Sequence, residues 1–517
     1  MPPKLVFTPK RSISPQCHPI LKKPRVDAHQ ENVNIDAGRG SDWPASHAKI
    51  EEARRFIRDC AERALHTIIV PDKDADGLSA GLILYRTLAS LGLSTERLHV
   101  HFLLKGTSIF SSLERERLNS LVRSLIPNSK SSPASSPSRT PMDPAEARII
   151  IVDQGSRPSP PLIDSALRSE TLIIDHHQSD EFPEAAQVLT ACRSPPIATS
   201  SLLTYLACLP LLKRDRESCA WLALIGIHGD LGASAVNFGT STSKNLKRQA
   251  SWPDREELRL LGDAAKTCTK KALGQAVSLL NGPRRTPEFN VRLAWDAILD
   301  ARSPADIVRR NDLLVIRERI NAEIARCGRS PPCFSKDGRI ALIRIDSAYQ
   351  VHPVIATRWA GSLKGKALEI IMVVNPSHHP DPNLVSFACR LSKRAREMPE
   401  VTRPNIIQIL KDYGEKVDVG LAKTRLNGPN TLAGTSDDVG SVTPFLDRVG
   451  DDYARGHKEA SGGIICKDAF EQLVEHGLEI SGGSGSPGKR IAASGKESQS
   501  RSLLDFFPQK QKPSSSS

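Results

Sequence analysis

Residues 67–79 have the sequence TIIVPDKDADGLS, in which a short apolar run ends at an aspartate and leads into a helical pattern. A short, continuous run of β-branched residues is typical of a strand buried on both faces of a sheet. Residues 147–153 (ARIIIVD) and 170–175 (ETLIID) are also apolar runs that stop at an aspartate, and residues 98–104 (LHVHFLL) form another strand candidate. Helical segments such as 78–91 alternate with these strands, so the sequence predicts an α/β fold with a parallel sheet.

The strand ends carry carboxylates and histidines. Ligands of open α/β sheets bind beyond the carboxyl ends of the strands, so we expect these side chains to gather at one edge. The three carboxylates of residues 72–76 repel one another unless a cation neutralises them, and hard divalent cations prefer oxygen ligands. A solvated acidic loop with a helix cap is the alternative for this segment alone.

Two further clusters add nitrogen donors and another acid. The triplet Asp175-His176-His177 can supply an orienting carboxylate, a metal ligand and a phosphate donor. Residues 225–230 (IGIHGD) close an apolar helix and end in a further aspartate.

With residues 152–155 (VDQG) at the end of another predicted strand, these make four clusters. Together they resemble, in order and context, the motifs of the DHH phosphoesterase superfamily. The D-x-D-A-D-G form of the first cluster is similar to that of the RecJ-like exonuclease branch. Residues 456–463 (GHKEASGG) resemble the G-G-H-x-x-A-x-G signature of the DHHA1 substrate-binding domain, although Arg455 stands where the first glycine is expected. The resemblance covers roughly residues 60–235 and 336–480.

The resemblance implies a role for each matching residue. The implied ligands of two Mn²⁺ or Mg²⁺ ions are Asp72, Asp74, Asp76, Asp153, His176 and Asp230, with Asp72 either a ligand or an acceptor behind the ligands. His177 would donate to the scissile phosphate, and Asp175 would orient its neighbours. The implied contacts to a phosphate or terminal nucleotide are Gly456, His457, Gly462, Gly463, Arg390 and Arg358.

Two ions about 3.5–4 Å apart can activate a water and neutralise a phosphate during in-line attack. The resemblance therefore implies a metal-dependent phosphodiesterase, with single-stranded DNA or RNA as substrate and exonuclease as the expected activity. One alternative is a nano-RNase or small-nucleotide phosphoesterase. Another is a catalytically silent replication scaffold on the same fold, which the acids retained in all four clusters disfavour.

The composition along the chain predicts five parts, with a Ser/Pro-rich surface insertion in the second. These are a disordered basic segment (1–45), the DHH catalytic domain (46–235, insertion 128–141), a helical connector (236–335), a smaller α/β DHHA1 domain (336–480) and a disordered tail (481–517). Tails rich in Ser, Gly and Pro with few large apolar residues cannot form a core of their own.

The net charge of +13 lies partly in the two ends, which carry +3 (residues 1–45) and +4 (residues 481–517). The basic cluster at residues 22–25 suggests nuclear import, with the cytoplasm as the alternative. We expect neither secretion nor a membrane partner, because the start lacks an apolar run and the longest apolar stretch, residues 202–212, is too short to span a bilayer. The ten cysteines form no C-x-x-C pair, which favours a reducing compartment.

The tail contains one apolar cluster, residues 500–507 (SRSLLDFF). It resembles the PCNA-interacting box Q-x-x-L-x-x-F-F, with Ser500 in place of glutamine. The resemblance implies that Leu503, Phe506 and Phe507 bind a sliding clamp (PCNA). A chance hydrophobic patch is the alternative.

Overall fold

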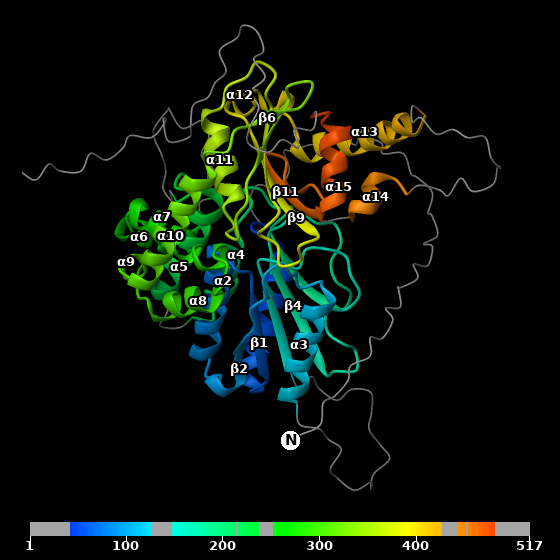
Figure 1. Cartoon of the computed structure of the whole chain (residues 1–517). Coiled ribbons are helices and arrows are strands. Elements are labelled where there is room, and N and C mark those ends of the chain that lie inside the picture. The colour runs from blue at the N-terminus through cyan, green and yellow to red at the C-terminus, as the bar shows by residue number, and fades with distance from the viewer. Residues whose placement is uncertain are drawn as a thin grey trace, which may run out of the picture. The chain divides into compact units, whose positions relative to one another are not determined.

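The computed structural model describes residues 42–126, 147–212, 216–236, 252–253, 255–426, 443–450 and 453–480. Its first sheet has five parallel strands in the order β2-β1-β3-β4-β5 (Figure 1). The strands are β1 (His66–Pro71), β2 (Leu98–Val100), β3 (Ala147–Val152), β4 (Ser169–Asp175) and β5 (Ala186–Thr190). This sheet confirms the predicted α/β fold.

The second strand is shorter than the predicted range 98–104. The N–H of His101 still bonds to the carbonyl of Ile69 at 2.9 Å, but the next part of the chain turns away from the sheet. There the N–H of Leu104 donates to the buried carboxylate of Glu114 at 2.7 Å. The Leu104 N–H thus donates to a side chain, whereas in a longer strand β2 it could donate to the backbone of the neighbouring strand.

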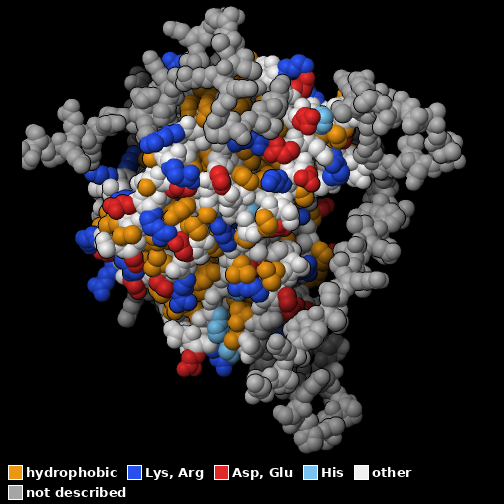
Figure 2. Space-filling view, in the orientation of Figure 1, with side chains coloured by type: hydrophobic (Ala, Val, Ile, Leu, Met, Phe, Trp, Pro, Cys, Tyr) orange, Lys and Arg blue, Asp and Glu red, His pale blue; other side chains and the backbone are white. Residues whose placement is uncertain are grey.

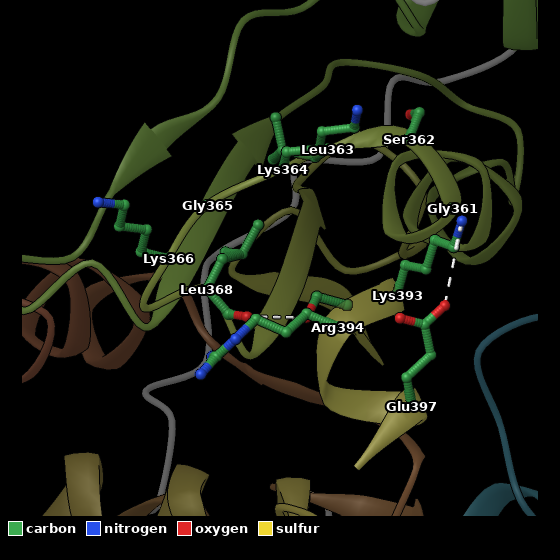
Figure 3. A pocket seen from close by; sticks show the side chains of 11 residues that line it. Gly361, Ser362, Leu363, Lys364, Gly365, Lys366, Leu368, Lys393, Arg394 and Glu397 are labelled. Atoms are coloured by element: carbon green, nitrogen blue, oxygen red, sulfur yellow. Dashed lines mark hydrogen bonds and ion pairs between the residues drawn. The ribbon is translucent and has the colours of Figure 1, made fainter.

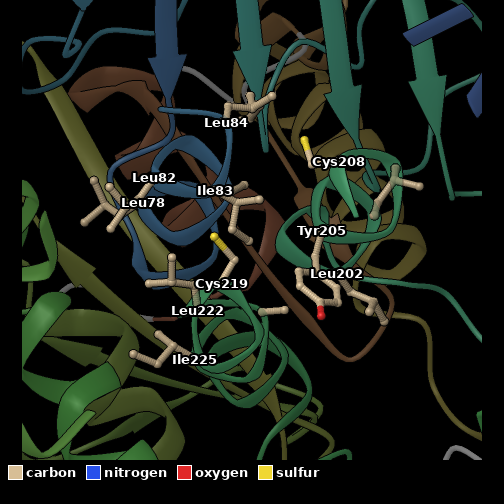
Figure 4. Close-up of a cluster of buried hydrophobic side chains, with 14 of the residues drawn as sticks. Leu78, Leu82, Ile83, Leu84, Leu202, Tyr205, Cys208, Cys219, Leu222 and Ile225 are labelled. Atoms are coloured by element: carbon tan, nitrogen blue, oxygen red, sulfur yellow. The ribbon is translucent and has the colours of Figure 1, made fainter. Parts of the chain in front are cut away.

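The helices of the first domain flank this sheet and include one that is buried almost all round. They are α1 (His47–Glu62), α2 (Ala75–Ser90), the short η1 (Thr95–Arg97), α3 (Ser112–Leu125), α4 (Ser200–Cys208) and α5 (Arg216–Leu231). Figure 4 shows Ile83 of α2 between Tyr205 of α4 and Cys219 of α5. A helix that is apolar on every side is stable only inside a core, which explains why α2 lies beneath α4 and α5.

Further helices follow, as predicted for the connector. They are α6 (Glu256–Thr267), α7 (Lys270–Leu280), η3 (Pro283–Arg285), α8 (Val291–Asp300), α9 (Pro304–Val308) and α10 (Asn311–Cys327). Their apolar faces join the core of the first domain, in one continuous cluster that runs from Trp43 to Leu313. The boundary placed at residue 236 stays a prediction.

A second, mixed sheet of six strands follows in the order β10-β11-β9-β8-β7-β6, with only the β7–β8 pair parallel. Its strands are β6 (Cys333–Phe334), β7 (Ile340–Arg344), β8 (Ile370–Asn375), β9 (Leu384–Leu391), β10 (Arg455–His457) and β11 (Ala460–Cys466). Its helices are α11 (His352–Ser362), α12 (Lys393–Glu397), η4 (Glu400–Thr402), α13 (Ile406–Leu426), α14 (Phe445–Val449), α15 (Lys467–Gln472) and the π-helical turn η6 (Leu473–Gly477).

Apolar side chains cover both faces of this second sheet. On one face Leu410 and Phe470 belong to a cluster with α13 and α15, and on the other Ile324 and Trp359 belong to a cluster with α10 and α11. The helix α10 therefore links the first domain to the second sheet. Within the described residues, no helix is both long and apolar enough to cross a membrane.

The second domain contacts the first through the segment that follows β7. The N–H of Gln350 donates to the carbonyl of Arg285 at 2.8 Å, and its side chain accepts from Arg284 at 3.1 Å. The ammonium of Lys105 donates to the carbonyl of Ala348 at 3.2 Å. The segment at residues 348–350 thus contacts the turn η3 of the connector and Lys105 of the first domain.

The surface of the described residues carries charges of both signs. On the face seen in Figure 2, Lys and Arg side chains lie among acidic and hydrophobic ones. Binding of a charged ligand on such a mixed surface depends on local clusters of one sign and on clefts that concentrate their field.

Candidate metal centre

The predicted ligands of the first domain meet at the carboxyl edge of the parallel sheet. One ligand atom from each of Asp76, Asp153, His176 and Asp230 lies within 4.8 Å of the others. The same limit holds for Asp72 and Asp74 together with Asp153. Asp153 is common to both sets, so the geometry offers two adjacent sites for cations that share one carboxylate.

The carboxylate of Asp76 is fixed by the first turn of α4. Its oxygens accept hydrogen bonds from the backbone N–H groups of Ser200 at 2.8 Å and Ser201 at 3.0 Å. These groups are the unpaired donors at a helix start, which favour a negative charge. The hydroxyl of Ser200 also donates to Oδ1 of Asp153 at 2.9 Å. Ser200 is not predicted from the sequence, where the only local signal is the helix start Thr-Ser-Ser at residues 199–201.

The first carboxylate cluster bends sharply between β1 and α2. Asp74 caps α2 and accepts from the N–H groups of Asp76 at 3.2 Å and Gly77 at 3.3 Å. A Cβ on Gly77 would lie 2.7 Å from the carbonyl oxygen of Asp72, so a larger residue would force this turn open. Asp72 and Asp74 can therefore face the same cavity only because residue 77 is a glycine.

Asp175 does not face the cation sites but holds the two histidines that follow it. It is fully buried, and its Oδ1 accepts from the N–H of His176 at 2.8 Å and from Nδ1 of His177 at 2.8 Å. Its Oδ2 accepts from the N–H of Ser156 at 3.1 Å. Burial opposes ionisation, but the His177 hydrogen bond, the histidine charges and the Ser156 donor outweigh it and lower the pKa of Asp175. Its position fits the predicted orienting role.

Electrostatic repulsion is strong where the acids crowd together. Burial and the nearby charge of Asp230 raise the pKa of Asp76 to about 6. Burial and Asp76 raise the pKa of Asp153 well above its usual value. Burial alone would lower the pKa of His176, but the surrounding carboxylates, Asp153 first, raise it to about 12. Protons thus supply the positive charge that a divalent cation would supply in their place.

The donor set fits a hard divalent cation. Nε2 of His176 is buried and lies 3.2 Å from Asp230 and 3.4 Å from Asp153, yet it forms no well-aligned hydrogen bond within the described residues. A buried nitrogen placed between carboxylates is what a metal ligand requires. Carboxylate oxygens with one imidazole are the ligand types that Mn²⁺ and Mg²⁺ accept. The cluster can therefore hold metal ions.

Most of these side chains, but not the fully buried Asp76 and Asp175, line a cavity of about 480 Å³. Its lining residues are Asp72, Asp74, Ala75, Asp153, His176, His177, Gln178, Cys192, Ile197, Gly229, Asp230, Leu231, Asn281, Arg284 and Arg285. The neighbouring His228 is not among them, and its ring packs beside Gly274 of α7 instead. Of the polar residues in the cluster at 225–230, Asp230 lines the cavity and His228 does not.

The same cavity also has a basic wall, which the sequence analysis missed. Arg284 lies 3.9 Å from Asp74, and its Nε donates to Oδ1 of Asn281 at 3.2 Å. Burial and the Arg284 charge lower the pKa of Arg285 to about 10. These residues belong to the short turn η3, where a Gly-Pro-Arg-Arg sequence at 282–285 gives no local sign of a site.

The residues predicted to bind substrate lie in the second domain, and none of those that the structure describes lines this cavity. Gly456, Gly462 and Gly463 belong to the β10–β11 hairpin, and Arg390 lies on the neighbouring strand β9, directly opposite Ala460. Gly456 has φ of 112°, and a Cβ there would lie 2.6 Å from the carbonyl of Ala460.

The remaining predicted residues are less defined. Arg358 lies half-buried on α11, and burial lowers its pKa. His457 belongs to β10, but its side chain lies outside what the structure describes. Leu503, Phe506 and Phe507 lie outside the described residues altogether, so clamp binding stays a prediction.

One further residue, His352, lies near both the residues of the cavity wall and the residues predicted to bind substrate. His352 begins α11 and is buried, and its Nδ1 has no hydrogen-bond partner among the described residues. Burial and the charges of His378, Arg390 and Arg285 lower its pKa well below the usual value. His352 therefore lies near both the basic cavity wall and the predicted substrate-binding strand.

Comparison with known proteins finds a family match for the first domain. Residues 66–227 match the DHH family, N-terminal domain, whereas no curated protein matches the chain. A solved DHH domain, described as belonging to a member of a family of ribosomal proteins, is 13% identical with a TM-score of 0.52, over 84% of this chain and 91% of that one. It has the same fold.

Two RecJ structures show weaker similarity. RecJ from Thermus thermophilus in complex with Mn²⁺ is 16% identical with a TM-score of 0.48, over 83% of this chain and 54% of that one. This chain thus spans about half of that protein. An exonuclease RecJ bound to manganese is 14% identical with a TM-score of 0.48, over 89% of this chain and 98% of that one. Residues 66–227 of this chain therefore match the DHH family, N-terminal domain, and they adopt an α/β fold.

Proposed function

We propose that this protein is a metal-dependent phosphodiesterase that hydrolyses single-stranded DNA or RNA, as an exonuclease of the RecJ-like branch. The observation that carries the proposal is the cavity in which two carboxylate sets share Asp153 and face Arg284 and Arg285. The acids can hold cations on one side of a phosphodiester substrate. The arginines can bind its phosphate oxygens on the other side.

The ligand sets divide between two proposed cation sites. Asp72, Asp74 and Asp153 would hold one Mn²⁺ or Mg²⁺ ion. The other ion would be held by Asp76, Asp153, His176 and Asp230. When bound, the ions would lower the pKa of a water and neutralise charge on the phosphate. The shared carboxylate of Asp153, held by Ser200, would fix the distance between them.

The histidine beside these ligands has the geometry of a phosphate donor. Nδ1 of His177 donates to the buried carboxylate of Asp175, which fixes the orientation of the ring. The ring lines the cavity, so its other nitrogen can donate to a phosphate oxygen as negative charge develops there. Asp175 acts through His177 and is a positioning residue.

The basic groups near the cavity suggest where the rest of the strand would lie. Arg284 and Arg285 line the cavity, and His352 lies near both Arg285 and Arg390. We infer that the sugar-phosphate backbone passes along these groups from the metal centre to strand β9. Arg390 and the β10–β11 hairpin would then contact a terminal nucleotide or phosphate, as the DHHA1 resemblance implies.

The direct test is cleavage of DNA and RNA oligonucleotides labelled at the 5′ or the 3′ end, with Mn²⁺, Mg²⁺ or EDTA. We expect metal-dependent release of products from single strands, and no cleavage by an Asp153→Asn variant. Cleavage of the shortest oligomers alone would favour the nano-RNase alternative. Strand binding without cleavage at micromolar protein would favour the scaffold alternative and contradict the proposal.

A further inference from the structure

A second concavity, called here the distal pocket, lies entirely in the second domain (Figure 3). It has a volume of about 830 Å³ and lies between the end of α11, the loop before β8 and helix α12. Its lining residues are Gly361, Ser362, Leu363, Lys364, Gly365, Lys366, Leu368, Ser392, Lys393, Arg394 and Glu397. The function proposed above uses none of them.

Positive charge dominates the rim of the distal pocket. Lys364, Lys366 and Arg394 are exposed and come from two separate segments of the chain. The single acid of the lining, Glu397, lies 4.0 Å from Lys393, so the other three cations have no carboxylate within the lining. Such a rim attracts a partner whose negative charges are spaced along it.

The floor of the distal pocket is apolar. Leu368 and Leu363 are both buried beside the rim. Ser392 does not contribute a free hydroxyl, because it donates to the carbonyl of Leu368 at 2.8 Å. A basic rim over this floor suits a nucleic-acid strand, since successive phosphates can reach Lys364, Lys366 and Arg394.

The distal pocket lies at the start of strand β8, and the other end of this strand lies toward the first domain. Leu368 comes just before β8, whose far end, Asn375, accepts a hydrogen bond from the N–H of Ser347 at 3.1 Å. Ser347 belongs to the segment that contacts the first domain through Gln350. Six strand residues at ~3.3 Å each separate the two ends by about 20 Å.

We propose that the distal pocket binds the phosphate backbone of the same single strand whose scissile phosphate occupies the metal centre. This proposal rests on the proposed function, and it adds a dependence on strand length. At about 3.4 Å per stacked nucleotide, roughly six nucleotides are needed to cover the length of β8 alone, so a strand that also reaches the metal centre must be longer. Longer strands gain contacts at the distal pocket, whereas shorter ones reach only the metal centre.

The test compares 20-nucleotide and 3-nucleotide strands in EDTA, by fluorescence anisotropy over a range of salt concentrations. The variant is Lys364→Glu/Lys366→Glu/Arg394→Glu, which changes exposed side chains only. We expect at least a tenfold weaker affinity for the long strand and a salt slope smaller by about 2, since each lost phosphate contact contributes ~0.7. Binding of the short strand should not change.

A matched control reverses three exposed charges elsewhere, as Arg259→Glu/Lys270→Glu/Lys271→Glu, and should keep most of the affinity. If the first variant does not fold, the corresponding glutamine variant replaces it. Unchanged binding of the long strand, or an equal loss for both strands, overturns the proposal. Displacement of the long strand by polyglutamate at equal charge also overturns it, in favour of an acidic protein partner.

The outcome is separate from that of the proposed function. If the wild-type protein binds long strands through the distal pocket but cleaves none in Mn²⁺, the pocket assignment stands and the nuclease proposal fails. If it cleaves long strands and the variant binds them equally well, the nuclease proposal stands and the pocket assignment fails.

Discussion

The hydroxyl of Ser200 lies 2.9 Å from Oδ1 of Asp153, while the backbone N–H of the same serine donates to Asp76 at 2.8 Å. One residue therefore holds two carboxylates, and one of them belongs to both proposed cation sites. The serine itself is buried and belongs to neither ligand set. It fixes the spacing of the acids before any cation binds.

Replacing Ser200 with alanine should weaken Mn²⁺ binding by about 10–100-fold, the usual effect of losing a partner behind a metal ligand. Isothermal titration calorimetry with Mn²⁺ measures this directly. Thr204→Ala, on the same helix, is the control, because its buried hydroxyl has no hydrogen-bond partner among the described residues. An unchanged affinity in Ser200→Ala would contradict the role of its hydroxyl.

Asp153 is the only carboxylate common to both ligand sets. An Asp153→Asn variant should therefore lose Mn²⁺ at both sites, whereas Asp72→Asn should affect only one. The loss should exceed the ~10–100-fold typical of an outer partner, because a direct ligand is removed. Electron paramagnetic resonance of Mn²⁺ counts the bound ions. Retention of one tight ion by Asp153→Asn would show that the sites do not share it.

The close packing of α5 against the site predicts a strong effect of one methyl group. A Cβ on Gly226 would collide with Oγ of Ser201 and Oδ1 of Asp76. Gly226→Ala should destabilise the fold by about 1–3 kcal/mol and also reduce Mn²⁺ affinity, because the carboxylate must move. Thermal unfolding and calorimetry measure the two effects. Gly361→Ala is the control, since nothing lies within 4 Å of its added Cβ.

Local sequence patterns predicted the parallel sheet and the gathering of acids at its edge, because both depend on short segments. Apolar runs that end at Asp72, Asp153 and Asp175 define strands, and parallel strands bring their carboxyl ends together. Residues supplied by distant segments were missed. Ser200 and Arg284 reach the site only through helix packing that no local pattern encodes.

The short second strand β2 is a further case in which a residue outside the segment decided the structure. Residues 98–104 are apolar enough for a full strand, but Glu114 accepts the N–H of Leu104 and ends the ladder early. The buried carboxylate of Glu114, ten residues after Leu104, thus ends the strand earlier than the local apolar pattern predicts. That acid also has a consequence for stability.

Glu114 is fully buried on α3 and is held by several donors. It accepts hydrogen bonds from the N–H of Leu104 and the hydroxyl of Thr107, both at 2.7 Å, and it faces His101 and Arg117. Burial opposes ionisation, but these donors outweigh it and lower the pKa of Glu114 below the usual 4.5. The carboxylate therefore stabilises the fold only while it is ionised.

A carboxyl group whose pKa is lower in the folded state contributes stability above its unfolded pKa, and the contribution is lost as the pH falls through the folded pKa. Glu114→Gln should therefore cost about 1–3 kcal/mol of unfolding free energy at pH 7, and the difference from wild type should shrink below about pH 4.5. Urea unfolding across this range measures the difference. Glu116→Gln, on the same helix but exposed, is the control and should match wild type at each pH. A difference for Glu114→Gln that stays constant down to pH 3 would mean that the ionised carboxylate is not the stabilising group.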